Sequence, residues 1–505
     1  MSFLFNNVTA IVVALVSSAL VWVFGGTRGD LLPAFVPWLF AIMLEVIFFF
    51  PQRHYGETTY EARARVWAAL KRDPVVWVSA GLLILLLIPF VNNGLCPVCD
   101  AAKIAQGIDP EPPATFLPFC VNRHDHMNVV LWFALALPCL VAVRDCLTRS
   151  GKRLVIELIV WNGAAVAALG FLQEALSAPG PLWCTLPDGS ASQGFFSTFG
   201  YPNMAGDYFV TLFGLAVALW RDRYEQDRLL RQAKDVSALA ENGRGAFWRR
   251  HYFLIPATVF FFAALNTLSR AAIILSTATA CLYFLHTLIS FLHRMRRVRR
   301  VYVGVWSLAV FGLLVFCANV YMPKSLQKEV DSLGTLEVLD RVTGRGQYHS
   351  RVATEIWKNH KLFGCGGWGY VHFCIPTMTP EERKGLQRVG GSNVHNDHLQ
   401  FLAEHGLVGF GAMVSLVFLL VAPVGRGWRR LVRDLRFKKG KDLPAKPIQI
   451  FALPAPVFFI LLTALSTTIH AFGDCPLRSP AVLTLFYVSL AAMPGFMPKF
   501  EDQTR

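Results

Sequence analysis

Apolar residues fall along this chain in long blocks rather than in the narrow stripes typical of surface helices. A helix needs roughly 20 mainly apolar residues to cross the hydrocarbon core of a bilayer. About twelve blocks approach that length, so the pattern predicts an all-α polytopic membrane protein with about 12 transmembrane helices. The blocks centre on residues 8–25, 31–50, 75–91, 127–143, 154–172, 205–220, 252–268, 271–290, 301–319, 399–423, 450–470 and 480–496. The first block has no basic stretch before it and no clear cleavage site after it, which favours a retained helix over a signal peptide.

One segment between the blocks, residues 320–398, is much longer than the others. It contains a helix-like stretch at 346–363, so we predict a partly helical loop between the ninth and tenth spans. Its length is marginal for an independent core, so the loop is expected to lean on the membrane helices. The expected organisation is therefore an N-terminal bundle over 1–319, the loop, and three C-terminal spans within 399–505.

Basic residues are distributed unevenly between the two sides of this predicted topology. The net charge is +15, and 54% of the residues are hydrophobic against 16% charged. With the N-terminus in the cytoplasm, 33 of the 48 Lys and Arg residues lie in cytoplasmic segments, and 10 of the rest lie in the loop 320–398. The positive-inside rule thus puts that loop on the outer side of the membrane. The basic inner face suits anionic membrane lipids, and nothing indicates nucleic acid.

Three cysteines, Cys96, Cys99 and Cys120, share one predicted outer loop. A C-x-x-C pair can bind metal or cycle between thiol and disulfide. No second pair accompanies it, so a structural disulfide in an oxidising compartment is the favoured interpretation.

The segment GGSNVHNDHLQFLAEHGLVGF (390–410) places His395, Asn396, Asp397 and His398 at the mouth of an apolar helix. Polar and titratable groups are costly there and persist where function needs them. His395 can act as a general base, because its ordinary pKa lies near working pH. The alternative is a polar residue at the interface that hydrogen-bonds Asn396 or Glu404.

Several charged residues fall at the same outer level as His395. Arg270 lies between two apolar blocks, and a planar guanidinium suits phosphate oxygens. Arg345 and Arg351 lie in the outer loop, and either could provide a second anion contact or simply face solvent. Asp474 and Arg478 lie between the last two spans. Arg270 could instead reach lipid headgroups.

Other polar residues are expected to support this site. Asp397 and Glu404 could fix the tautomer of the imidazole, and Asn203, in FGYPNMAGDY, could cap the sixth span. His395 and His398 stand three residues apart, but no third ligand converges with them, so no metal is expected. No Gly-rich phosphate loop of the P-loop type occurs, so no nucleotide cofactor is expected either.

These motifs together resemble the O-antigen ligase and polymerase family of bacterial envelope glycosyltransferases. HNDHLQFLAEHGLVGF is similar to the family's His-Asn motif, TLSRAA to its Ser-Arg motif, and FGYPNMAG to its Pro-Asn motif. The run from Arg345 through NHKLFGCGGWGY resembles its loop helix and G-x-G turn, although Lys361 stands where the family often has Pro. The segment around Asp474 resembles its end-of-chain pattern. The resemblance covers about residues 190–470.

The resemblance implies transfer of a glycan from a polyprenyl pyrophosphate carrier to an acceptor hydroxyl on the periplasmic face, without metal or nucleotide. It implies that His395 is the catalytic histidine and that Arg270, with Arg345 or Arg351, binds the pyrophosphate. The acceptor stays open between lipid A core (a ligase), a growing glycan (a polymerase) and a protein hydroxyl. A non-enzymatic transporter of lipid-linked glycans is the alternative from another class, and it should carry titratable groups near the bilayer midplane.

Overall fold

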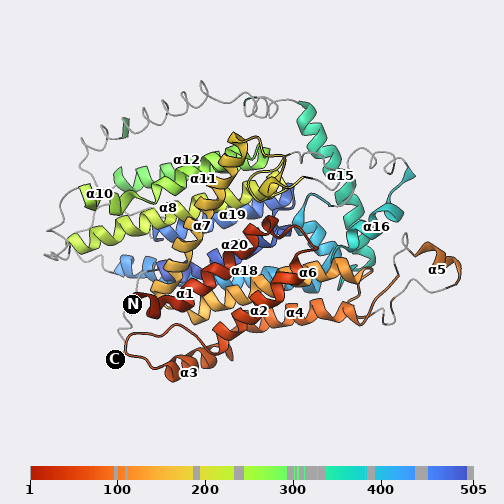
Figure 1. Ribbon diagram of the computed structural model, residues 1–505, viewed down its shortest axis with the longest axis horizontal. Helices are drawn as coiled ribbons and strands as arrows, with labels where there is room; N and C mark the ends of the chain where they lie inside the picture. Colours follow the sequence, from red (N-terminus) through yellow and green to blue (C-terminus); the bar gives the residue numbers. More distant parts are fainter. Residues whose placement is uncertain are drawn as a thin grey trace.

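The computed structural model of the chain is helical throughout the residues that it describes, with no strand among them beyond two isolated bridges. It describes residues 2–95, 100–107, 116–185, 194–232, 244–292, 336–380, 393–437 and 453–497, together with a few single positions between these ranges. Most helices run roughly parallel along the long axis of the molecule (Figure 1). An all-helical arrangement is what a bilayer requires, because a helix satisfies its own backbone hydrogen bonds.

The helices follow one another with short connections in most of the described ranges. Their bounds are α1 Ser2–Ala19, α2 Leu32–Phe48, α3 Thr59–Leu70, α4 Pro74–Leu87, α5 Ala101–Ala105, α6 Arg123–Val141, α7 Arg149–Ala175, α8 Pro202–Gln232, α10 Arg244–His251, α11 Leu254–Asn266, α12 Arg270–Leu292, α15 Leu336–Asn359, α16 Gly369–Thr377, α18 Asp397–Phe437, α19 Ala455–Gly473 and α20 Pro480–Ala492.

Length and composition qualify six of the described helices as candidate membrane spans, or seven if the bent pair α3–α4 forms one span. The six are Arg123–Cys146, Arg149–Ala175, Pro202–Asp227, Arg270–Leu292, Asp397–Arg429 and Ala455–Gly473. Four further apolar helices are shorter: Asn7–Trp22, Leu32–Phe48, Leu254–Asn266 and Pro480–Phe496. Each apolar block of the sequence therefore coincides with a helix except 301–319, which lies outside the described residues apart from single positions. The described helices are consistent with a polytopic membrane protein. The total of twelve membrane spans stays a prediction.

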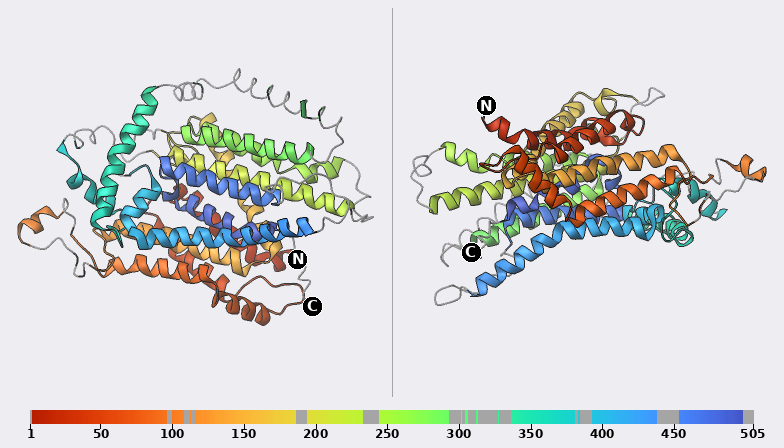
Figure 2. Two further views of the ribbon diagram at one scale, coloured as in Figure 1. Left: turned by 180° about the vertical axis from the view of Figure 1, so that it is seen from behind. Right: turned by 90° about the horizontal axis from the view of Figure 1, so that it is seen from below.

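The described part of the long loop is mostly helical. Its main helix, α15, already begins at Leu336, whereas the sequence indicated a helix only from residue 346. Together α15 and α16 lie across one end of the bundle, near the beginning of α18, as the views in Figures 1 and 2 agree. They share a small buried cluster with α18 that includes Val352, Tyr370 and Ala403 and is separate from the main core. The described residues 336–380 thus pack against α18, and the account of the whole loop stays a prediction.

The predicted domain boundaries and the predicted disulfide both involve residues outside the described ranges. The predicted boundary at 319 lies outside the described residues, and the boundary at 398 stays a prediction, one residue after the start of α18 at Asp397. Cys120 is a buried free thiol whose Sγ donates to the Pro89 carbonyl at 3.3 Å. It therefore forms no disulfide here, while Cys96 and Cys99 lie outside the described residues.

Glycines allow the loop before α16 to dock on the first turns of α18. Gly364 and Gly366 adopt the left-handed backbone region, with φ of 72° and 85°. A Cβ at Gly364 would come within 2.2 Å of the Glu404 backbone. The Cys365 and Gly366 amides donate to the carbonyls of α18 residues 403 and 404, at 3.1 and 2.8 Å. The GCGGWG segment is thus a backbone clamp on α18.

Candidate active site

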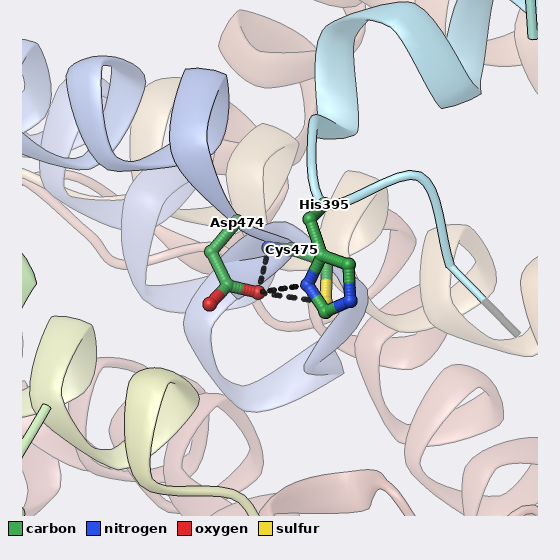
Figure 3. A group of neighbouring side chains, drawn as sticks. All are labelled: His395, Asp474 and Cys475. Atoms are coloured by element: carbon green, nitrogen blue, oxygen red, sulfur yellow. Dashed lines mark hydrogen bonds and ion pairs between the residues drawn. The ribbon is translucent and has the colours of Figure 1, made fainter. Parts of the chain in front are cut away.

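His395 is held just before α18 by a turn that the sequence encodes locally. Asn396 caps the helix, because its Oδ1 accepts the Leu399 amide at 3.0 Å. His395 itself has φ of 54°, the left-handed region that only a few residue types tolerate readily. Histidine is among the tolerated types, and the turn aims its ring away from the axis of α18 and towards the end of α19 (Figure 3).

Asp474 is the partner of His395 in the structure. The Nδ1 of His395 lies 3.3 Å from Oδ1 of Asp474, which follows the last residue of α19. A carboxylate only accepts hydrogen bonds, so the contact favours the tautomer with the proton on Nδ1. The Nε2 lone pair is then free for a proton from another molecule. The side chain of His395 is 36% exposed and that of Asp474 only 10%, so a substrate can reach the imidazole but not the carboxylate.

The carboxylate of Asp474 is itself held by several donors. Tyr201 donates to both oxygens at 3.0 and 3.1 Å, and the Asn203 amide donates to Oδ2. The Cys475 amide donates to Oδ1 at 2.7 Å. Burial disfavours the charged form, but the hydrogen bond and charge of His395 outweigh it, so the pKa of Asp474 lies below its ordinary value. Burial and the nearby carboxylate raise the pKa of Tyr201, which therefore stays a donor.

A ladder of polar pairs joins α8 to α19 below this cluster. Asp207 accepts from His470 Nδ1 at 3.0 Å and from the Thr467 hydroxyl at 3.0 Å. Thr467 also contacts Thr211 at 3.1 Å. Residues 203, 207 and 211 are one helical turn apart on α8, so this face of α8 meets residues 474, 470 and 467 in order. Because the His470 carbonyl accepts the Asp474 amide at 3.0 Å, the ladder fixes the end of α19 that presents Asp474.

A second buried cluster fixes the beginning of α18. The Nη2 of Arg478 donates to Glu404 at 2.6 Å, and its Nε lies 3.7 Å from Asp397. Asp397 also accepts the Leu477 amide at 2.8 Å. The guanidinium lies over the Trp368 ring, 4.6 Å from its centre. Asp397 and Glu404 therefore pair with Arg478 rather than with His395, and their expected role in fixing the imidazole tautomer belongs to Asp474.

The remaining expected residues fall in different places. His398 donates from Nε2 to the Thr468 carbonyl at 3.1 Å. Arg270 begins α12, and a Cβ on Gly206 of α8 would come within 2.4 Å of Ala272 Cβ and 3.3 Å of Ser269 Cβ. Since Gly206 follows Asn203 by three residues, Arg270 lies at the same end of α8 as Tyr201 and Asn203.

The two loop arginines differ in their surroundings. Arg351 is exposed, and its Nη2 is 3.5 Å from the Thr377 carbonyl. Arg345 belongs to α15, one helical turn before His349, and its side chain lies outside the described residues. His349 is buried, its Nδ1 lies 2.7 Å from the Tyr370 hydroxyl, and its ring centre is 6.2 Å from that of His395. Helical position thus favours Arg345 over Arg351 as the arginine nearer the site.

Sequence reasoning missed Tyr201, Cys475 and His349 at this site. A signal existed for the first two, because Tyr201 lies in the Pro-Asn motif segment and Cys475 follows Asp474 directly. His349 had none, since only the docking of α15 brings it near His395.

An apolar groove lies beside α18. It has a volume of about 420 Å³ and extends between α18 and α20, with His398, Thr468 and Leu477 among its lining residues. A groove lined by aliphatic and aromatic side chains suits a hydrocarbon chain. His398 and Leu477, which line the groove, follow His395 and Asp474, respectively, by three residues in the chain. The candidate site itself offers a proton acceptor, His395, backed by a buried carboxylate.

Comparison with known proteins supports an envelope enzyme. Residues 255–414 match the family described as O-antigen ligase, a segment that contains Arg270, Arg345, His395 and Glu404. No curated protein matches the chain. The family match supports a ligase or glycosyltransferase-like function in the cell envelope, in a multi-pass membrane protein. Over residues 255–414 the chain is thus similar to the O-antigen ligase family, and the match supports the resemblance indicated by the sequence motifs.

Proposed function

We propose that the protein is an envelope glycosyltransferase that moves a glycan from a polyprenyl pyrophosphate carrier to an acceptor hydroxyl on the periplasmic face of the inner membrane. The observation that carries the proposal is the exposed imidazole of His395 with its Nδ1 on the buried carboxylate of Asp474, 3.3 Å away. Such a pair presents an unprotonated Nε2 to a substrate hydroxyl and stabilises the imidazolium that forms.

In the proposed reaction His395 Nε2 takes the proton of the acceptor hydroxyl as its oxygen attacks the anomeric carbon. The bond from that carbon to the pyrophosphate oxygen breaks, and the lipid pyrophosphate leaves with the electron pair. Attack opposite the leaving group inverts the anomeric configuration. General-base assistance contributes roughly 10²–10⁴ in rate.

The leaving pyrophosphate requires positive charge, which arginines at the outer end of the bundle provide. Arg270 lies at the same end of α8 as the residues that hold Asp474. Arg345, one turn before His349 on α15, is the favoured second arginine, and Arg351 is the alternative. Electrostatic stabilisation of this kind is worth on the order of 10²–10³ in rate for one donor. No metal or nucleotide enters the proposed reaction.

The polyprenyl chain would lie in the groove between α18 and α20. This groove is largely apolar, and its end at His398 and Leu477 adjoins the loops that carry His395 and Asp474. A lipid-linked donor could thus enter from the bilayer. The polar groups of the site cluster at one end of α8 and α19, which favours an enzyme over a transporter with a site at the midplane.

The acceptor distinguishes three related functions: a ligase transfers to lipid A core, a polymerase to a lipid-linked repeat, and a protein O-oligosaccharyltransferase to a Ser or Thr hydroxyl. The family match supports a ligase or glycosyltransferase-like function, and the three acceptors are separated by experiment. In a deletion strain, loss of all ladder bands of surface polysaccharide supports ligation, whereas retention of a single repeat indicates polymerisation.

The His395→Ala variant tests the catalytic assignment. We expect glycan transfer to fall by at least about 10², because no base accepts the hydroxyl proton. Surface glycan on gels, the amount of membrane-inserted protein and the amount of lipid-linked donor are measured together. Normal transfer by the variant would refute the assignment, whereas accumulation of donor on the cytoplasmic side would favour the transporter.

A further inference from the structure

Three side chains of different chemistry converge at the end of α19. The Nδ1 of His395, an oxygen of Asp474 and the Sγ of Cys475 all lie within 4.8 Å of one another (Figure 3). Two of the separations are shorter, because both Nδ1 and Sγ lie 3.3 Å from the same Oδ1. His398, three residues from His395, is not part of this group, because its Nε2 donates to the Thr468 carbonyl.

We propose that His395, Asp474 and Cys475 form an inhibitory binding site for a divalent metal ion of the zinc type. Imidazole, thiolate and carboxylate are the ligands that Zn²⁺ takes, and three of them leave a fourth tetrahedral position open for water. With bonds of about 2.0–2.3 Å, neighbouring ligand atoms in a tetrahedron lie about 3.3–3.7 Å apart. The two separations of 3.3 Å in the structure meet that requirement with little movement.

The surroundings of Asp474 are those of a supported ligand. Outer hydrogen bonds orient metal ligands, and here Tyr201, the Asn203 amide and the Cys475 backbone hold the carboxylate. Cys475 is 1% exposed and Asp474 7%, so the site lies in a protein interior that favours direct coordination. The partly exposed ring of His395 provides the route by which an ion enters.

Metal binding would stop the base without changing the fold. The ion replaces the proton of the Cys475 thiol, which leaves to solvent, and forms a bond to Sγ. It also takes the place of the Nδ1 proton of His395, which moves to Nε2. An imidazole with Nδ1 on a metal and a proton on Nε2 has no lone pair for an acceptor hydroxyl. The inhibition therefore rests on the proposed function, whereas the binding of the ion does not.

Cobalt(II) provides a direct probe of binding, because a thiolate ligand gives it an intense charge-transfer absorption. The full-length protein, purified in detergent without an affinity tag and stripped with a chelator, is titrated with Co²⁺ and then with Zn²⁺. We expect one Co²⁺ per chain with thiolate absorption, displaced by Zn²⁺. Cys475→Ala should lose the absorption and bind at least about 100-fold more weakly, since loss of a supporting residue alone costs 10–100-fold.

Cys365→Ala is the matched control, because Cys365 is also fully buried at the same end of the molecule but is not one of the three proposed ligands. The Cys365→Ala protein should keep the thiolate absorption of bound Co²⁺. Unchanged Co²⁺ binding by Cys475→Ala, or its loss in Cys365→Ala, would overturn the site. If Cys475→Ala does not fold, X-ray absorption of the zinc-loaded wild-type protein replaces it, and absence of a sulfur ligand at about 2.3 Å overturns the site.

The inhibition is measured as glycan transfer with and without Zn²⁺, each variant relative to its own metal-free rate. We expect at least tenfold inhibition of the wild-type protein and none of Cys475→Ala at the same concentration. Binding without inhibition would overturn the inhibitory role alone. Wild-type protein with no transferase activity that still binds Co²⁺ through sulfur would refute the proposed function and leave the metal site standing.

Discussion

At the scale of single residues, the site depends on Asp474 as much as on His395. Asp474 joins the imidazole to Tyr201 and Asn203, and it accepts hydrogen bonds on both carboxylate oxygens. In the proposed reaction it would therefore set the tautomer of His395 and balance the imidazolium charge. The sequence indicated His395 as the base, but it indicated Asp474 only as one of several supporting residues.

Replacing Asp474 by Asn should lower glycan transfer by about 10²–10⁴, because the amide keeps the shape but loses the charge that stabilises the imidazolium. The fall should be in kcat more than in KM for the donor. Steady-state kinetics in detergent or nanodiscs checks this. The control is Asp125→Asn, which alters another Asp–His pair, with His372 at 3.0 Å. A rate for Asp474→Asn equal to that of this control would contradict the linking role.

At the scale of helices, the beginning of α18 is placed by contacts between backbones. Gly406 interrupts the helix with φ of 62°, and a Cβ there would come within 2.2 Å of the Leu362 carbonyl oxygen. The Leu407 amide donates to the Lys361 carbonyl at 2.9 Å just beyond it. The three glycines of EHGLVGFG thus differ in kind, since only Gly406 combines a positive φ with a close approach to another backbone, whereas nothing lies near a Cβ at Gly411.

Gly406→Ala should separate the GCGGWG clamp from α18 and lower transfer at least tenfold, with a loss of stability of about 1 kcal/mol or more. Gly411→Ala in the same helix is the control. No atom lies within 4 Å of a Cβ at Gly411, so that change should be neutral or slightly stabilising. Thermal unfolding and transfer are measured for both variants. Equal effects would show that the kink does not place the site.

At the scale of the whole molecule, the groove between α18 and α20 is the proposed place of the donor's lipid chain. Val414 lines it and is 51% exposed, so a larger side chain there would fill the groove without overpacking the core. Leu465 on α19 is similarly exposed, at 52%, but does not line the groove. Substitutions at these two positions, one inside the groove and one outside it, therefore test whether the groove holds the lipid chain of the donor.

Val414→Trp should raise KM for a long-chain donor by about tenfold, because the indole occupies volume that the chain would use. Leu465→Trp should change it little, and neither variant should affect a soluble donor analogue with a short chain. Kinetics with donors of two chain lengths measure the effect. A Val414→Trp enzyme with normal KM for the long donor would place the lipid elsewhere.

The sequence by itself determined the helical membrane class, because long apolar blocks have no other stable form in a bilayer. It also indicated His395 and Arg270 as candidate site residues, since titratable or charged groups beside apolar blocks cost free energy and tend to persist where function needs them. Only the tertiary structure decided that Asp474 pairs with His395 while Asp397 and Glu404 pair with Arg478. Those partners lie about 70 to 80 residues apart along the chain, and which carboxylate meets which cation depends on how the ends of α18 and α19 dock. Periodicity fixes the face of a helix, but not the neighbour that the face meets.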